Sequence, residues 1–258
     1  MKFLKAEHNK NGIIQAIEKA TIMAKEYGEA ITVCNMGQNC TGPCEGCCSI
    51  PAEIELVCFD MDATIIKTES INEIFKNTGL QNNSKMAVSA FEELTESAMS
   101  GKADFTANFK ERVALLKGIE VTQIRKTAYA LPLANGIEKL IKALKDRGIK
   151  TALITGNFDI IGRVMQQRLE FDFVYTSVPE VKEGKLTGKL HNPVIDADAK
   201  SDILCKICRS NNISLCKTIV VGDGANDIKM MAKSAIAVAY NAPIAKESMA
   251  DAILSLIK

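Results

Sequence analysis

Apolar positions along the chain follow two different patterns. Residues 54–59 and the stretch from residue 132 onward carry short apolar runs, separated by segments with an apolar residue every three or four positions. Short continuous runs are typical of strands buried on both faces, and the wider spacing is typical of helices packed on one side. We expect strands at residues 54–59, 150–155, 171–176, 217–224 and 235–240, a hairpin at 183–190, and helices at 137–144, 158–169, 198–211, 226–234 and 243–250.

This alternation predicts an α/β fold, a doubly wound, Rossmann-like parallel sheet with helices on both faces. Residues 69–131 interrupt it with helical patterns alone, and Asp104 can cap one of these helices. An insertion just after the first core strand hangs over the carboxyl ends of the strands and can act as a lid. We therefore predict a core of residues 52–68 and 132–258, an all-helical cap of residues 69–131 and an N-terminal extension of residues 1–51.

The N-terminal extension combines a helical pattern at residues 12–27, a strand at 30–34 and a loop rich in Gly, Pro and Cys. The spacing Cys44-Glu-Gly-Cys47 resembles half of a zinc or iron–sulfur knuckle, and a second pair would have to come from neighbouring cysteines. Two interpretations stay open, ordinary structural thiols or a second, structural metal. The ligands of that metal would be Cys40, Cys44, Cys47 and Cys48.

Composition narrows the class of protein. The 258 residues include 47% hydrophobic and 24% charged side chains, and the net charge is +1. This balance is that of an ordinary globular protein and argues against a broad nucleic-acid or membrane-surface partner. No apolar stretch approaches the roughly 18 residues of a membrane span, and the first residues contain no secretion signal. Nine cysteines, an odd number, suit reduced thiols, so we expect a cytoplasmic protein.

Polar residues suited to phosphate or metal follow three of the predicted strands. Asp60 and Asp62 follow the first, Asp223 lies at the end of the strand predicted at 217–224, and Asp227 follows that strand. The first pair taken alone would equally suit a solvated turn. Parallel strands end at one edge of a sheet, however, and four carboxylates gathered there would repel one another unless a cation lay among them. An oxygen-rich site completed by phosphate and water suits Mg²⁺.

The third strand end carries Thr155, Gly156 and Asn157, where a hydroxyl and backbone N–H groups can receive an anion. Lys200 opens a helix and can neutralise phosphate charge. The whole set describes a phosphoryl-transfer site with an aspartate nucleophile. The loop "GDGAND" does not suit a dinucleotide, because Asp227 replaces the third glycine of that fingerprint.

At this point the chain resembles the haloacid dehalogenase superfamily and, within it, the phosphoserine phosphatases. The resemblance covers roughly residues 54–258 and rests on four ordered motifs and a matching cap segment. The motifs are "DMDAT", "TGN", Lys200 and "GDGAND", and the cap segment is "MSGKADFTANFKERVALLKG".

The resemblance implies an enzyme, a Mg²⁺-dependent phosphomonoester hydrolase that acts on O-phosphoserine in serine biosynthesis. Asp60 would be the nucleophile and Asp62 the general acid and base. Thr155, Gly156, Asn157 and Lys200 would hold the phosphate. The implied metal residues are Asp60, Asp62 through its carbonyl, Asp223 and Asp227, and the implied substrate residues are Glu69 for the ammonium, Arg112 for the carboxylate, Met99, Phe105 and Asn226.

The chain departs from the phosphoserine phosphatase pattern at two positions. Asn157 stands in a segment that commonly reads Ser-Gly-Gly, and Ala63 stands where a serine is usual. Both changes bear on substrate fit more than on chemistry. Two alternatives therefore stay open: another small phosphomonoester such as phosphohomoserine as the substrate, or a phosphotransferase. The N-terminal cysteine cluster leaves a third open, a metal- or redox-sensing regulatory protein built on this domain.

Overall fold

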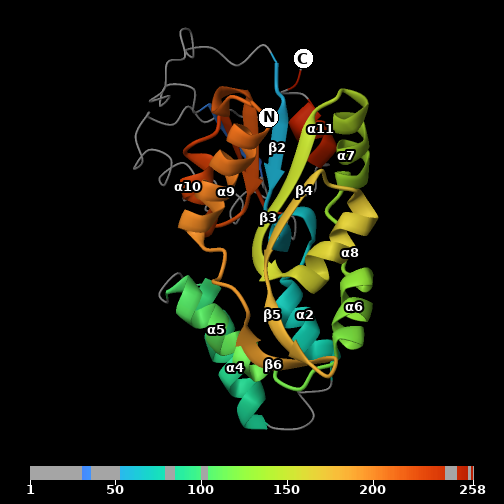
Figure 1. The fold of residues 1–258 in the computed structure, drawn as a ribbon, viewed down its shortest axis with the longest axis vertical. Helices are drawn as coiled ribbons and strands as arrows, with labels where there is room; N and C mark the ends of the chain where they lie inside the picture. Colours follow the sequence, from blue (N-terminus) through green and yellow to red (C-terminus); the bar gives the residue numbers. More distant parts are fainter. Residues whose placement is uncertain are drawn as a thin grey trace.

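The structure is a computed structural model that describes residues 31–35, 53–78, 85–99, 104–241, 249–254 and 257. Its centre is a six-stranded sheet of order β1-β8-β7-β2-β3-β4 (Figure 1). All neighbouring pairs except β1 with β8 are parallel. The strands are β1 Ile31–Asn35, β2 Leu56–Phe59, β3 Lys150–Phe158, β4 Phe173–Ser177, β7 Thr218–Gly222 and β8 Ile236–Tyr240.

Helices cover both faces of this sheet, as the alternating pattern predicted. One face carries α7 (Ile137–Asp146), α8 (Asp159–Leu169) and α11 (Met249–Leu254), and the other carries α9 (Ala197–Ser210) and α10 (Ile228–Met231) (Figure 1). Strand β2 shows why: Val57 and Phe59 belong to the first hydrophobic core, whereas Leu56 and Cys58 belong to the second. Alternate side chains of a strand point to opposite faces, so both faces of this apolar run are buried.

The predicted cap forms helices in its described part. These are α2 (Ser70–Asn77), α4 (Lys85–Met99), α5 (Phe105–Leu115) and α6 (Val121–Ala130), which lie below the sheet in Figure 1. The Asp104 side chain caps α5 by accepting a hydrogen bond from the Ala107 N–H at 2.7 Å. The predicted domain boundaries themselves stay a prediction.

A hairpin far along the chain, β5 (Pro179–Lys182) with β6 (Lys185–Leu190), joins the cap. Its turn, Glu183 and Gly184, adopts left-handed φ values of 50° and 75°, which suit a two-residue hairpin turn. The Gly118 N–H donates to the Leu186 carbonyl, and the Leu186 N–H donates to the Ile119 carbonyl, at 2.8 and 2.9 Å. Backbone hydrogen bonds therefore join the helical cap to this hairpin, which the sequence pattern assigned to the core domain.

The structure differs from the sequence-based elements in three places. Strand β3 continues to Phe158, past the expected end at 155, with a break in its pairing to β4 between Ile154 and Phe158. The helix expected at 226–234 is one tight turn, Ala225–Asp227, followed by the short α10. Strand β1 joins the sheet in the antiparallel direction. The spacing of apolar residues does not predict these features, because it stays the same when the backbone pairing changes.

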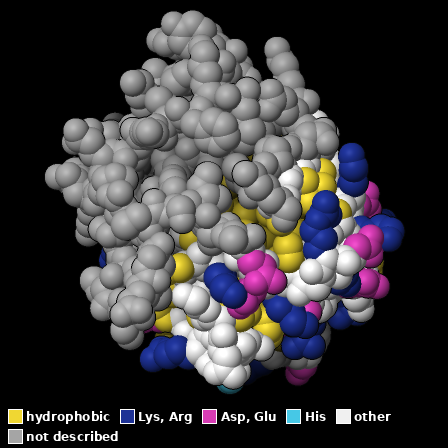
Figure 2. All heavy atoms as spheres, turned by 90° about the horizontal axis from the view of Figure 1, so that it is seen from above, with side chains coloured by type: hydrophobic (Ala, Val, Ile, Leu, Met, Phe, Trp, Pro, Cys, Tyr) yellow, Lys and Arg dark blue, Asp and Glu magenta, His cyan; other side chains and the backbone are white. Residues whose placement is uncertain are grey.

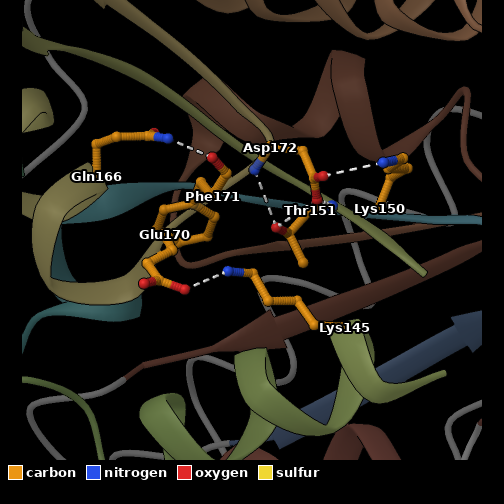
Figure 3. A network of polar contacts seen from close by, with 7 residues as sticks. All are labelled: Lys145, Lys150, Thr151, Gln166, Glu170, Phe171 and Asp172. Atoms are coloured by element: carbon orange, nitrogen blue, oxygen red, sulfur yellow. Dashed lines mark hydrogen bonds and ion pairs between the residues drawn. The ribbon is translucent and has the colours of Figure 1, made fainter. Parts of the chain in front are cut away.

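The amino ends of β3 and β4 are tied by a polar network (Figure 3). Asp172 accepts hydrogen bonds from the Thr151 N–H at 2.8 Å and from the Thr151 hydroxyl and Lys150 Nζ at 3.1 Å. Lys145 of α7 pairs with Glu170 at 2.6 Å, and Gln166 of α8 donates to the Phe171 carbonyl. Figure 3 shows these side chains gathered where α7, α8 and the two strands meet.

One face of the molecule agrees with the small net charge. Where Figure 2 shows described residues, Lys and Arg side chains are interspersed with Asp and Glu around a few hydrophobic side chains. None of the helices in the described residues has the length and apolar character needed to cross a bilayer.

Candidate active site

The site lies at the carboxyl ends of the parallel strands, facing the cap. Strand β2 ends at Phe59, and the chain then turns tightly through Met61–Ile65. Ala63 adopts a left-handed backbone with φ of 51°, and the Ile66 N–H closes the turn on the Met61 carbonyl at 3.1 Å. The Asp60 N–H donates to the Val221 carbonyl of β7 at 2.9 Å, which fixes the start of the turn against the neighbouring strand.

Lys200 stands between two buried carboxylates. Its ammonium donates to Asp60 Oδ1 and, at 2.8 Å, to Asp227 Oδ1, and none of these three side chains is more than 6% exposed. Carboxylate oxygens of Asp60, Asp223 and Asp227 lie within 4.8 Å of one another. The structure thus brings together the two acidic motifs and the lysine, which come from three separate parts of the chain.

The cluster contains three carboxyl groups and one ammonium. Burial raises the pKa of Asp60 to about 7, with Asp227 adding to the rise and Lys200 opposing it. Burial, then the charges of Asp60 and Asp227, raise the pKa of Asp223 well above its ordinary value. Burial alone would lower the pKa of Lys200, but Asp227 and Asp60 hold it above its usual range. The three carboxylates provide the oxygen ligands that a hard divalent cation prefers, and one ammonium alone does not balance their charge when they are ionised. The residues therefore fit such an ion.

Thr155 and Asn157 lie buried at the irregular end of β3. The Asn157 N–H donates to the Thr155 hydroxyl at 3.1 Å, so a hydroxyl and a backbone amide come together beside the cluster. Gly156 lies between them with little free space: a Cβ there would lie 2.9 Å from the Ile195 carbonyl oxygen and 3.1 Å from the Phe105 ring. A side chain at position 156 would therefore force the cap residue Phe105 away from the core.

The Asp62 carboxylate turns away from the cluster toward the first turn of α2. Its Oδ1 accepts from the Ser70 N–H at 2.6 Å, and its Oδ2 accepts from Asn157 Nδ2 at 3.0 Å. Asn157 Nδ2 also donates to the Ser70 hydroxyl at 2.7 Å. The two aspartates of the first motif thus point to different neighbours, one to Lys200 and one to the cap.

Arg112 of α5 is buried in the cap and directed toward α2. Its Nη2 donates to Asn72 Oδ1 at 2.6 Å, its guanidinium lies 5.4 Å from the Phe91 ring centroid, and its Nε has no partner among the described residues. Burial lowers the pKa of Arg112, although Glu69 and Asp62 oppose that effect. Burial and the charge of Asp62 raise the pKa of Glu69 to about 8. A buried cation and a buried acid thus lie near the Asp62 side of the site.

The remaining predicted residues have no described hydrogen bond to the acidic cluster. Asn226, half-buried in the turn before α10, places Oδ1 2.9 Å from where a Gly224 Cβ would be, and no described hydrogen bond links it to the cluster. Met99 ends α4, but its side chain lies outside the described residues, as do Cys40, Cys44, Cys47 and Cys48.

Sequence reasoning missed two residues that the structure places in the site, Ser70 and Asn72. Ser70 contacts Asp62 and Asn157, and Asn72 accepts the hydrogen bond from Arg112. Asn72 follows Glu69 by three positions, so the helical spacing places both on one face of α2, which is a signal that could have singled it out. Ser70 gave no such signal, because serine is common at helix starts.

Comparisons with known proteins agree with this geometry. The family model of the haloacid dehalogenase-like hydrolases matches residues 54–234. The phosphoserine phosphatase of Methanocaldococcus jannaschii is 37% identical over 194 residues, which cover 75% of this chain and 89% of the relative. The phosphoserine phosphatase of Idiomarina loihiensis is 38% identical over 196 residues, 76% of this chain and 86% of the relative.

Solved structures give the same result. A phospho-aspartyl intermediate analogue of phosphoserine phosphatase aligns with a TM-score of 0.67 and 32% identity, covering 80% of this chain and 100% of that one. A substrate-bound phosphoserine phosphatase complex also gives a TM-score of 0.67 at 32% identity, over 80% of this chain and 99% of that chain. The predicted family and fold class are confirmed.

Proposed function

The chain belongs to the haloacid dehalogenase-like hydrolases, and we propose that it is a Mg²⁺-dependent phosphatase that converts O-phosphoserine and water into serine and phosphate. The observation that carries the proposal is the buried Asp60–Lys200–Asp227 group, with Asp223 beside it, at the carboxyl ends of the strands. The curated relatives named phosphoserine phosphatase support the choice of substrate.

Asp60 is the proposed nucleophile. An Asp60 oxygen bonds to phosphorus while the bond from phosphorus to the serine oxygen breaks, and an aspartyl-phosphate forms. Asp62 gives a proton to the departing serine oxygen. Asp62 then takes a proton from the water that attacks the aspartyl-phosphate, which restores Asp60 and releases phosphate.

The proposed phosphate cradle comprises the Thr155 hydroxyl, the backbone N–H groups of Gly156 and Asn157, and Lys200. Donors held by the backbone can stabilise the charge on the equatorial oxygens during transfer. The Asn157 N–H, which donates to the Thr155 hydroxyl in this structure, would exchange that contact for the phosphate. When bound, Mg²⁺ would neutralise carboxylate and phosphate charge. Asp60, Asp223 and the Asp62 carbonyl would hold this ion, and Asp227 would hold its water shell, consistent with the clustered carboxylates of the site.

The proposed choice of an amino-acid phosphate rests on Arg112 and Glu69. The Arg112 guanidinium is buried, its Nε has no partner in the described part of the chain, and it can pair with a substrate carboxylate. Glu69 suits the substrate ammonium. Phe105 lies against Gly156 and would close over the phosphate end, with Met99 and Asn226 as further substrate contacts. The proposed setting is the cytoplasm and serine biosynthesis.

A screen of phosphate release from small phosphomonoesters tests the proposal. We expect O-phosphoserine to give a higher kcat/KM than phosphohomoserine or phosphoethanolamine, and chelation of Mg²⁺ to abolish release from all three. Release that prefers phosphohomoserine would support the nearest alternative substrate. No release from any ester by the folded, Mg²⁺-supplied protein would contradict the proposal and favour a regulatory role.

Replacing Arg112, which is proposed to bind the substrate carboxylate, tests which phosphate ester the site prefers. Arg112→Ala should lower kcat/KM for O-phosphoserine roughly thirtyfold, the value of a charged hydrogen-bonded pair, and should affect phosphoethanolamine far less. Asn108→Ala is the matched control, because Asn108 is also a buried residue of α5 and its side-chain amide donates to the Leu94 carbonyl, away from the site. Equal losses on both esters would show that Arg112 supports the cap instead of the substrate.

A further inference from the structure

Asn157 joins three segments of the site through its side-chain amide. The residue comes from the end of β3 and is 4% exposed. Its Nδ2 donates to Asp62, in the turn after β2, and to Ser70, at the start of α2, at 3.0 and 2.7 Å. Its Oδ1 accepts from the Phe158 N–H at 2.8 Å. Every hydrogen-bonding group of the amide thus meets a neighbour of the right kind.

These partners fix the orientation of the amide. An ionised Asp62 can only accept a hydrogen bond, and the Phe158 N–H can only donate one. A flipped amide would set Oδ1 against the Asp62 carboxylate and turn Nδ2 toward a second donor, so both contacts would become repulsive. The observed orientation is the one that satisfies both partners.

We propose that Asn157 is a positioning residue: its side chain holds the Asp62 carboxyl group at the angle needed to exchange a proton with the leaving oxygen. The inference rests on the proposed function, in which Asp62 is the general acid and base. It goes beyond the backbone role in phosphate binding, because the side-chain amide contacts Asp62 and Ser70.

Two anchors from different elements are needed to fix a carboxyl plane. The end torsion of an aspartate is broad, so a single hydrogen bond leaves the group free to swing. The Ser70 N–H holds Oδ1 at 2.6 Å, and Asn157 holds Oδ2 at 3.0 Å. Each oxygen has two lone pairs, so both contacts leave room for the transferred proton and persist in either protonation state.

The consequence depends on the leaving group. When phosphorus moves from a serine oxygen to Asp60, the electron pair of the broken bond stays on an alkoxide, which needs the proton of Asp62. When it moves from acetyl phosphate, the same electron pair stays on acetate, which is stable without a proton. A misaligned Asp62 therefore slows transfer from the alkyl ester and leaves transfer from acetyl phosphate almost unchanged.

The test compares kcat/KM on both substrates, because this ratio covers steps up to leaving-group departure. Asn157→Ala should lower kcat/KM for O-phosphoserine on the order of tenfold through kcat, with KM little changed, and that for acetyl phosphate by less than about threefold. Asn157→Ser, which has only one proton to donate, should show the same selectivity and serves if the alanine variant fails to fold. Asn108→Ala, which loses a buried amide contact elsewhere, should show none.

A double-mutant cycle identifies the route of the effect. In an Asp62→Ala background, Asn157→Ala should cause no further selective loss, because there is no carboxyl group left to position. Equal losses on both substrates, or an additive loss in that background, would overturn the proposal and assign Asn157 to the phosphate or the fold. A parent protein that hydrolyses neither substrate would instead contradict the proposed function, so the two failures are distinct.

Discussion

Two polar clusters lie at opposite ends of the same sheet, one around a single aspartate and one around three, and they differ in how the carboxylates are partnered. At the amino ends of β3 and β4, Asp172 is surrounded by donors from Thr151 and Lys150. At the carboxyl ends of β2 and β7, three carboxylates share the single ammonium of Lys200 among the described residues.

The pKa values follow the same division. Burial tends to raise the pKa of Asp172, but its hydrogen bonds to Thr151 and Lys150 outweigh burial and lower it. At the other end, burial and like charges raise the pKa of Asp60 and Asp223 despite Lys200. The hydrogen bonds around Asp172 stabilise the fold. The carboxylates of Asp60, Asp223 and Asp227 have too few partners among the described residues until a cation binds them, and the cation can then bind a phosphate. The difference shows that burial of an acid is a guide to function only when its partners are counted.

The largest effect should come from Asp60→Asn. An amide cannot form the aspartyl-phosphate, so turnover of O-phosphoserine should fall by about three orders of magnitude or more. The metal-free variant should unfold at the same or a higher denaturant concentration than the parent, because the raised pKa of Asp60 means that its charge is unfavourable in the fold. Turnover near the parental level by a folded, Mg²⁺-supplied variant would remove Asp60 as the nucleophile.

The two clusters should also respond to pH in opposite directions. Folded, metal-free protein keeps the Asp60 proton up to a pKa of about 7, whereas the ordinary value is 3.8. The folded state therefore binds more protons over this range, and this group makes the free energy of unfolding fall as pH rises from about 4 to about 7.

Mg²⁺ should reverse that loss, since it binds the deprotonated carboxylates. A hundredfold excess over its Kd should stabilise the protein by about 2.7 kcal/mol at pH 8 and much less at pH 5. Urea unfolding with Mg²⁺ or with a chelator at several pH values measures this, and Asp223→Asn is the control that should weaken the stabilisation. Mg²⁺ stabilisation that is independent of pH would contradict the assignment of the cluster.

Asp172→Asn tests the other end. Loss of its charged hydrogen bonds should lower the free energy of unfolding by about 1–2 kcal/mol at neutral pH and leave kcat/KM unchanged. Because its pKa is lowered in the fold, this contribution is present above the ordinary value of 3.8 and is lost as pH falls below it. Urea titrations at pH 7 and pH 3 check the trend. Glu170→Gln, which breaks only the exposed pair with Lys145, should change stability by no measurable amount.

Replacing Cys40, Cys44, Cys47 and Cys48 by serine should have little effect on activity. The catalytic core has its own hydrophobic core and its own acidic cluster, so phosphatase activity should stay within a few-fold of the parent, on the order of 1 kcal/mol in barrier. Elemental analysis of the reduced parent decides separately between thiols and metal. A loss of several orders of magnitude in the folded variant would place these cysteines in the active site.

Much of the core and its acidic cluster could be predicted because both follow from local patterns. Buried parallel strands have continuous apolar runs, and acids directly after two such runs must meet at one edge of the sheet. Asp60, Asp223 and Asp227 needed no further information. Lys200 was predicted to hold phosphate, whereas its ion pairs with Asp60, 140 positions away, and with Asp227 are tertiary contacts that the sequence did not predict.

Contacts made by side chains between distant segments were beyond the sequence. Asn157 reaches Asp62 across 95 positions and Ser70 across 87, and nothing in local spacing signals either contact. A hairpin was predicted at 183–190 from its glycines, but its first strand begins earlier, at Pro179, and Gly188 lies within β6. Its attachment to the cap depends on backbone pairing with residues 118–121. Such pairing involves no particular side chain, so no residue pattern records it.

That attachment has a consequence for engineering by recombination. The bonds of Gly118 and Ile119 to Leu186, and of the Val121 N–H to the Gly184 carbonyl at 2.9 Å, join main-chain groups only. A cap segment transplanted from a relative would find the same donors and acceptors on the hairpin, whatever its side chains. This junction therefore constrains the backbone of the cap more than its side chains, and a chimera that keeps Ser70, which contacts Asp62 and Asn157, could exchange specificity while the hairpin and the catalytic edge stay in place.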